Sequence, residues 1–199
     1  MVTDNITTKK VVLWLLKDFS QTHTITSLAS KLNLSRVGIW KVLKKLAEHN
    51  LVEITPIGSG KTSTFVAKIN LNNILVEKMI ALYLTQEAML QMRWRKNFAE
   101  LEQKTSFCIL YGSILHSAQE ANDIDVINVS FSKGKFIQIQ QTIDKIQKTQ
   151  HKKIHAINFT DAEFTQELLK KNPVFIDAIK KGVILFGQEN LIKFLKKIY

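Results

Sequence analysis

The sequence predicts an α+β protein made of two domains that a helix connects. Residues 8–49 carry apolar side chains at helical spacing, and two β-branched runs follow around Gly58-Ser59-Gly60-Lys61. Residues 71–104 contain neither Gly nor Pro, as expected of a long helix. Beyond residue 105, apolar strand-like runs alternate with helical segments. We therefore expect domains at 1–70 and 105–199, with a connector helix at 71–104.

The chain is strongly basic. It has 28 Lys and Arg residues against 17 Asp and Glu, a formal net charge of +11, and the excess is densest in residues 1–70. This balance favours polyanionic partners, such as nucleic acid or nucleotides. No apolar run is long enough to span a bilayer and no signal-peptide pattern is present, so we expect a cytoplasmic protein.

Cysteine and histidine give little sign of a metal site. The single cysteine, Cys108, excludes an intramolecular disulfide and a cysteine-rich zinc site, and it lies in an apolar run where a core position is expected. The five histidines show no metal-ligand spacing.

The first domain should contain three helices and a hairpin. Thr26 is expected to cap the second helix and Ser35 the third, because a side-chain oxygen before a helical segment can accept from its first N–H groups. The expected elements, in order, are helices at 8–19, 27–32 and 36–49 and strands at 51–57 and 62–69.

This order resembles the winged helix-turn-helix family of DNA-binding domains. With Ile39, Val42, Leu43 and Leu46 turned inward, the third helix would present a basic face to the major groove. The resemblance implies double-stranded DNA as a partner, although winged helices also serve as protein-interaction modules. The candidate DNA-contacting residues are Ser35, Arg36, Trp40, Lys41, Lys44, Lys45 and, at the tip of the wing, Lys61.

The run GSGKT at 58–62 is similar to the end of a phosphate-binding P-loop. The full pattern needs Gly where Thr55 stands, and it needs a helix where the strand-like STFVAKI follows. We therefore interpret this run as the wing.

The connector at 71–104 should be one helix that Asn72 or Asn73 caps. Its apolar residues recur every three or four positions, so one stripe must be buried. Either domain could cover that stripe, or a second copy of the chain could, and we expect a homodimer.

The sequence YGSILHSAQEANDIDV, residues 111–126, carries the best candidate for a chemical site. Gly112-Ser113 follows the apolar run 107–111, and Asp123 and Asp125 are separated by one apolar residue. On a strand both carboxylates would share a face. Two acids beside a tight turn could hold Mg²⁺ and a triphosphate, because hard cations prefer oxygen ligands.

These residues resemble the nucleotidyltransferase superfamily of DNA polymerase β, especially its minimal members. The resemblance covers residues 105–199 and implies a mixed sheet with flanking helices, Mg²⁺ (or Mn²⁺) as cofactor and a nucleoside triphosphate as substrate. It implies that Asp123 and Asp125 ligate the metal and serve catalysis. It also implies that Gly112 and Ser113 contact the nucleotide. Family members often have a basic residue and a Gly soon after Gly-Ser, and here those positions hold His116 and Ser117, so His116 is a candidate phosphate contact whose alternative is a histidine of a surface loop.

The sequence departs from that family at one ligand. The family has a third carboxylate on a later strand, whereas the matching run 153–159 contains no acid. Asn158 would be a weak neutral ligand, and Asp161 and Glu163 lie just beyond the run. The other elements expected here are helices at 136–149 and 161–171, the latter capped by Thr160, and a helix from Pro173 that breaks at Gly182 before a returning strand.

Three functions follow from these patterns. The first is a DNA-binding protein that transfers a nucleotidyl group to an acceptor hydroxyl. The second is a non-catalytic transcriptional regulator whose C-terminal domain senses a nucleotide or dimerises. The third is an antitoxin-like partner of another protein, a role that the minimal nucleotidyltransferase resemblance also implies.

Overall fold

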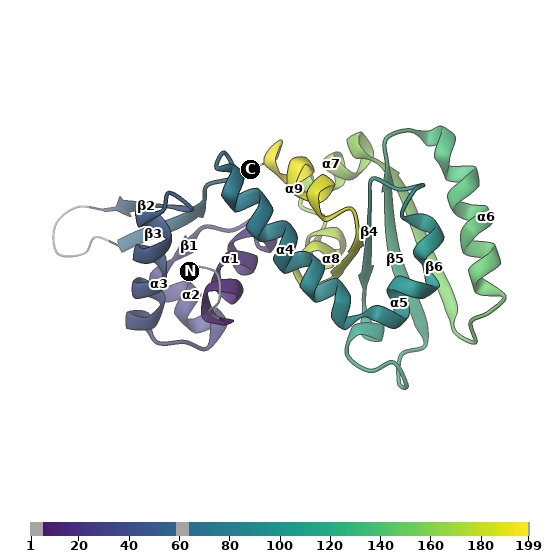
Figure 1. The fold of residues 1–199 in the computed structure, drawn as a ribbon, viewed down its shortest axis with the longest axis horizontal. Coiled ribbons are helices and arrows are strands. Elements are labelled where there is room, and N and C mark those ends of the chain that lie inside the picture. Colours follow the sequence, from purple (N-terminus) through teal and green to yellow (C-terminus); the bar gives the residue numbers. More distant parts are fainter. Residues whose placement is uncertain (1–5, 59–63, 199) are drawn as a thin grey trace. The chain divides into compact units, whose positions relative to one another are not determined.

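The computed structural model describes residues 6–58 and 64–198. It is an α+β structure with a three-stranded antiparallel sheet and a four-stranded mixed sheet (Figure 1). The chain divides into two compact units, Met1–Tyr83 (unit 1) and Leu84–Tyr199 (unit 2). Among the described helices, none combines the length and the apolar character that crossing a bilayer requires.

Unit 1 has the predicted helices and hairpin, with ends shifted by two residues or fewer. A short strand that the sequence did not predict, β1, joins the sheet in the order β1-β3-β2. The elements are α1 (Ile6–Lys17), β1 (His23–Thr24), α2 (Ile25–Leu32), α3 (Arg36–Glu48), β2 (Val52–Ile57) and β3 (Thr64–Ile69).

The caps of unit 1 confirm one prediction and correct another. Ser35 caps α3 as predicted, since its Oγ accepts from the N–H of Gly38 at 3.0 Å. Thr26 does not cap α2. The cap is Thr24, which exchanges hydrogen bonds with Ser27 in a capping box, so α2 begins two residues earlier than expected. Ile39, Leu43 and Leu46 of α3 are fully buried as predicted, whereas Val42 is only half-buried.

The prediction of a single connector helix at 71–104 is wrong. Residues 71–104 form α4 (Ile74–Leu90), α5 (Met92–Asn97) and a 3₁₀ turn, η2 (Ala99–Leu101), with a break at Gln91. The break allows Trp94, Phe98 and Leu101 to pack into the core of unit 2. Hydrophobic burial of these side chains therefore prevails over the helix propensity of the run. Asn73 is the residue that accepts from the start of α4, at the N–H of Leu75.

Unit 2 is built on a sheet of strand order β6-β5-β4-β7. β4 pairs antiparallel with β5 and β7, and β5 pairs parallel with β6. The predicted helices and the returning strand are present, including the Thr160 cap and the break at Gly182. The elements are β4 (Phe107–Tyr111), η3 (Ser113–Leu115), β5 (Asp123–Ser130), η4 (Lys133–Lys135), α6 (Phe136–Gln147), β6 (Lys153–Thr160), α7 (Asp161–Leu169), α8 (Pro173–Lys181), β7 (Val183–Phe186) and α9 (Gln188–Lys196).

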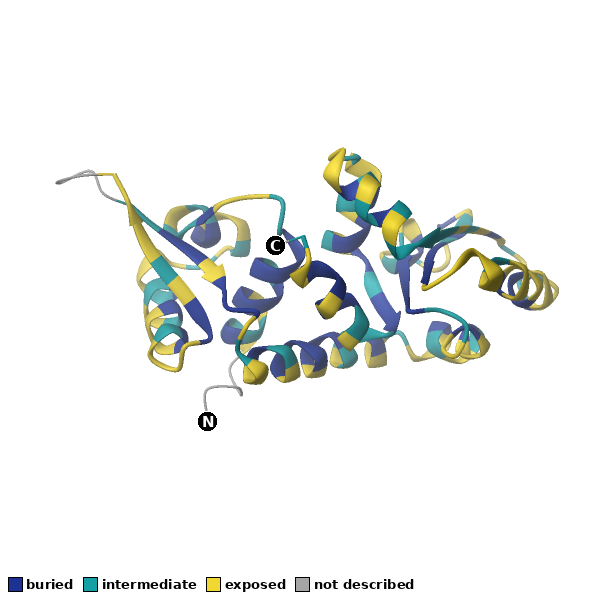
Figure 2. Ribbon diagram, turned by 90° about the horizontal axis from the view of Figure 1, so that it is seen from above, coloured by how far each residue is buried: buried dark blue, intermediate teal, exposed yellow. Residues whose placement is uncertain are grey.

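The sheet of unit 2 is covered on both faces. On one face, side chains of α5, η2 and α6 pack against Cys108, Leu110, Ile124 and Val126. On the other, α7, α8 and α9 contribute to a cluster of aromatic rings, Phe107, Phe159, Phe164, Phe175 and Phe194. Figure 2 shows the resulting pattern, with buried residues along the central strands and on the inner sides of the helices.

Cys108 occupies the core position that the sequence predicts. It is fully buried, and burial raises the pKa of its thiol to about 12. The thiol is therefore an inert packing group rather than a nucleophile.

Candidate metal and nucleotide site

Asp123 and Asp125 lie at the start of β5 and share one face of the sheet. Ile124 between them is 1% exposed and packs into the core on the opposite face. Asp125 is paired across the antiparallel ladder with Tyr111, the last residue of β4. The turn that leaves β4, Gly112–Ser113, therefore begins directly beside the Asp125 carboxylate.

Gly112 is required at this turn for two reasons. Its φ of 83° and ψ of −164° lie in a region that side chains other than Gly adopt only with strain. A Cβ at this position would also lie 2.4 Å from Oδ2 of Asp125. The chain thus uses the smallest residue to bring a backbone turn into contact with a carboxylate.

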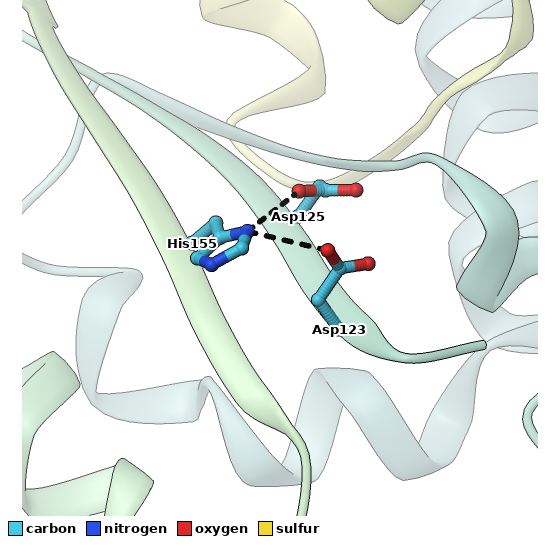
Figure 3. Close-up of side chains that lie close together, drawn as sticks. All are labelled: Asp123, Asp125 and His155. Carbon is cyan, nitrogen blue, oxygen red and sulfur yellow. Dashed lines mark ion pairs between the residues drawn. The ribbon is translucent and has the colours of Figure 1, made fainter.

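The structure adds a third polar group to the two aspartates, and sequence spacing gave no sign of it. Parallel pairing of β5 with β6 sets His155 opposite Asp125. Nδ1 of His155 lies 3.3 Å from Oδ2 of Asp123 and 3.6 Å from Oδ1 of Asp125 (Figure 3). One potential ligand atom from each of these residues lies within 4.8 Å of the others. We call Asp123, Asp125 and His155 the acid–imidazole trio.

The predicted substitutes for a third carboxylate lie elsewhere. Asn158 faces the opposite side of the sheet, where its Oδ1 accepts from Nδ2 of buried Asn128 at 3.0 Å. Glu163 is engaged in the capping box of α7 and in an ion pair with Lys133 at 2.8 Å. Hydrogen bonds from Lys133 and Thr160 hold the pKa of Glu163 at about 2. The position next to Asp125 on the neighbouring strand is occupied by an imidazole.

The electrostatics around β5 favour an additional positive charge. Partial burial raises the pKa of Asp125, and the negative charge of Asp123 raises it further, while His155 acts in the opposite direction. Burial also raises the pKa of Tyr111, as do the charges of Asp125 and Asp123. A cation bound by the two carboxylates would relieve this repulsion.

A cavity of about 390 Å³ adjoins the Gly112–Ser113 turn. Its wall includes Tyr111, the turn itself and His116 on one side and residues of α8 on the other. Lys181 of α8 lines it and forms an ion pair with Asp177 at 2.6 Å. The predicted nucleotide-contacting residues Gly112, Ser113 and His116 are therefore brought to one cavity, and Lys181 is a residue of that cavity that sequence reasoning missed.

The candidate DNA-contacting residues lie mostly on the exposed face of α3. Arg36, Lys41, Lys44 and Lys45 are exposed. The hydroxyl of Ser35, another candidate, caps the helix. Lys61 lies outside the described residues.

Trp40 does not extend into solvent as expected. It is half-buried, with its ring 5.1 Å from that of Phe65 on β3, and Nζ of Lys44 lies 5.9 Å from its ring centroid. The indole of Trp40 thus packs between Phe65 of the hairpin and Lys44 of the basic face of α3. Trp40 therefore packs partly against the hairpin, and its role as a DNA contact stays a prediction.

Comparisons with known protein families, curated protein sequences and solved structures found no match for this chain. Its function therefore has to be inferred from the chemistry of these residues.

Proposed function

We propose that unit 2 binds a nucleoside triphosphate together with a divalent cation and transfers its nucleotidyl group to an acceptor hydroxyl. The hydroxyl oxygen would bond to the α-phosphorus as the bond to the β-phosphate breaks, releasing pyrophosphate and the hydroxyl proton. The observation that carries this proposal is the convergence of the acid–imidazole trio beside the Gly112–Ser113 turn. Two carboxylates, an imidazole and a backbone turn at one edge of a sheet can together hold a cation and the phosphates that share it.

The order of elements also supports the proposal. An apolar strand, β4, leads through Gly-Ser to an antiparallel strand that carries Asp-Ile-Asp, and a further strand brings His155 to the same place. This is the order that the resemblance to nucleotidyltransferases implies, with an imidazole where that family has a carboxylate.

The residues present fit a divalent cation. The 3.3 and 3.6 Å separations from Nδ1 of His155 to the two carboxylates are close to those of ligand atoms that share one metal ion. With bonds of about 2.1 Å, such atoms lie about 3.0 to 3.4 Å apart. Burial is the main cause of the raised pKa of Asp125, and the negative charge of Asp123, which such an ion would offset, raises it further.

A bound cation would supply Lewis-acid stabilisation of the negative charge on the reacting phosphate. The chain contributes the rest. Asp123, Asp125 and His155 would hold the ion, while Ser113 and Lys181 would orient phosphate oxygens from the two walls of the cavity. The cavity volume of about 390 Å³ lies within the usual range for small-molecule sites.

Transfer of labelled nucleotide tests this proposal. Wild-type protein incubated with Mn²⁺ or Mg²⁺ and each α-labelled nucleoside triphosphate should label an acceptor, either a nucleic acid or a protein. The double variant Asp123→Asn, Asp125→Asn should not. A matched control, Asp144→Asn with Glu120→Gln, removes the same two charges from exposed positions of unit 2 and should keep the activity. Binding of nucleotide by wild type without any transfer would favour the regulator that senses a nucleotide.

We also propose that unit 1 binds duplex DNA. If unit 2 is an enzyme, this binding would bring its activity to DNA. If unit 2 senses a nucleotide, it would make the protein a transcriptional regulator. The supporting observation is the exposed basic face of α3, formed by Arg36, Lys41, Lys44 and Lys45. Asn33, with φ 52° and ψ 51°, makes the tight turn from α2 to α3 that a helix-turn-helix requires. Lys side chains on such a helix neutralise phosphates and release counterions.

A further inference from the structure

The third position of the metal site differs in kind from the first two. Asp123 and Asp125 offer hard carboxylate oxygens, whereas His155 offers an imidazole nitrogen. One ring nitrogen faces both carboxylates (Figure 3). It is Nδ1, which lies 3.3 Å from Oδ2 of Asp123 and 3.6 Å from Oδ1 of Asp125. Whether the third donor atom is a nitrogen or an oxygen affects which cation the site prefers.

Mg²⁺ is a poor match for such a donor set. It demands near-ideal octahedral oxygen coordination and gives up its water reluctantly. Imidazole nitrogen instead suits first-row transition cations, whose affinity for nitrogen and oxygen sites rises from Mn²⁺ to Co²⁺ and beyond. Replacing one carboxylate by an imidazole also lowers the negative charge of the site, which weakens attraction for a cation that binds mainly by charge.

Resting on the metal site of the proposed function, we propose that the acid–imidazole trio selects a divalent transition cation of the Mn²⁺ and Co²⁺ class over Mg²⁺. His155 is the ligand that confers this preference, through Nδ1. Asp123 and Asp125 supply the two carboxylates that any divalent cation would use.

The placement of His155 supports a ligand role. Its backbone is fixed by the ladder between β5 and β6, in register with Asp125, so the ring is presented to the carboxylates without help from a loop. Its side chain is 46% exposed, which leaves the far ring nitrogen accessible to water. To bind a cation through Nδ1, the neutral ring would carry its proton on Nε2 and direct the lone pair of Nδ1 at the cation.

The competing explanation is a simple ion pair between an imidazolium and the two aspartates. Charge-assisted N–H···O bonds are usually about 2.7–2.9 Å long. Both distances from Nδ1 exceed that range, and they are nearly equal rather than one short and one long. A hydrogen bond from His155 also lowers the pKa of Asp125, so cation titration rather than these two distances distinguishes the two explanations.

Titration calorimetry of the intact chain with Mg²⁺, Mn²⁺ and Co²⁺, each alone, tests the preference. Wild type should bind Co²⁺ and Mn²⁺ more tightly than Mg²⁺. His155→Asp, which restores a third carboxylate, should lower the ratio of the Mg²⁺ to the Co²⁺ dissociation constant by roughly tenfold or more, mainly by strengthening Mg²⁺ binding. His151→Asp makes the same chemical change at an exposed residue outside the trio and should leave the ratio at its wild-type value.

A second variant and a spectroscopic readout make the test independent of one substitution. His155→Gln should weaken Co²⁺ binding much more than Mg²⁺ binding, and it should shift the visible absorption of bound Co²⁺, because the substitution removes a nitrogen ligand. Equal ratios in wild type, His155→Asp and His155→Gln would overturn the inference while leaving a cation site. Failure of wild type to bind any of the three cations would overturn the metal site of the proposed function as well.

Discussion

Gly112 and Asp125 approach each other so closely that a methyl group on Gly112 would lie 2.4 Å from Oδ2 of Asp125. The turn that leaves β4 is therefore packed against the carboxylate on β5, and a side chain at position 112 would displace that carboxylate.

Gly112→Ala should consequently damage both stability and cation binding. The φ of 83° strains any side chain, at a cost of about 1–3 kcal/mol, and the new methyl group would displace Asp125. Urea denaturation should show the reduced stability, and thermal melting should show a smaller rise on addition of Mn²⁺. Gly134→Ala is the matched control, because its methyl group would lie 3.8 Å from Ser132 Oγ and meet no closer atom. Normal cation-induced stabilisation in Gly112→Ala would contradict this relationship.

Glu163 should stabilise the protein at neutral pH and lose that contribution in acid. Its pKa is about 2 in the folded protein and 4.5 in an unperturbed chain, because Lys133 and Thr160 bond its ionised form. A depressed pKa adds stability that is fully present above pH 4.5 and is lost as the pH falls towards 2. Glu163→Gln should therefore be less stable than wild type at pH 7, and the difference should narrow steadily below pH 4.5. Urea denaturation at pH 7, 5 and 3 measures this; a difference that stays constant with pH would be the contrary result.

Duplex DNA binding should depend steeply on salt and on the basic face of α3. Removing one lysine that neutralises a phosphate should reduce the slope of log affinity against log salt by about 0.9. Lys41→Ala with Lys44→Ala should weaken binding and flatten the slope without unfolding the protein, since both side chains are exposed. Fluorescence anisotropy at several salt concentrations measures both effects.

The control for this test removes two charges elsewhere. Lys135→Ala with Lys148→Ala makes the same change of net charge at exposed positions of unit 2 and should leave DNA affinity nearly unaltered. If wild type shows no affinity for duplex DNA even at low salt, unit 1 is a protein-interaction module instead.

The homodimer remains a prediction, and exposed apolar residues of α4 are the candidate interface. Leu75, Leu82 and Met89 recur every seven residues along α4 and are 66%, 53% and 48% exposed, so these apolar side chains lie uncovered along the helix. Light scattering should give twice the 22.8 kDa chain mass at micromolar concentration. Leu82→Glu should shift the protein towards the monomer, whereas a monomeric wild type would show that this stripe is not a dimer interface.

Local patterns were sufficient to predict much of the fold. The Ser35 and Thr160 caps, the start of α8 at Pro173 and the Gly182 break were all predicted because each depends on neighbours within a few residues. The break of the connector at Gln91 could not be predicted in this way. No Gly or Pro marks it, and its cause is the burial of Trp94, Phe98 and Leu101 against strands far along the chain.

The candidate site was predicted only in part, for a similar reason. Asp123 and Asp125 are two residues apart, so strand geometry alone places them on one face. His155 follows 30 residues after Asp125 and reaches it through the parallel register of β5 and β6, which the sequence does not reveal. Its spacing from other histidines was uninformative because its partners are carboxylates on a different strand.

Nucleotide binding is the most direct test of the account. Calorimetric titration of wild type with each of the four common nucleoside triphosphates should give cation-dependent binding of at least one of them, in the presence of Mn²⁺ or Mg²⁺. The same titration should give none for Asp123→Asn with Asp125→Asn, and binding at the wild-type level for Asp144→Asn with Glu120→Gln. Absence of binding to wild type with every nucleotide and both cations would contradict the account.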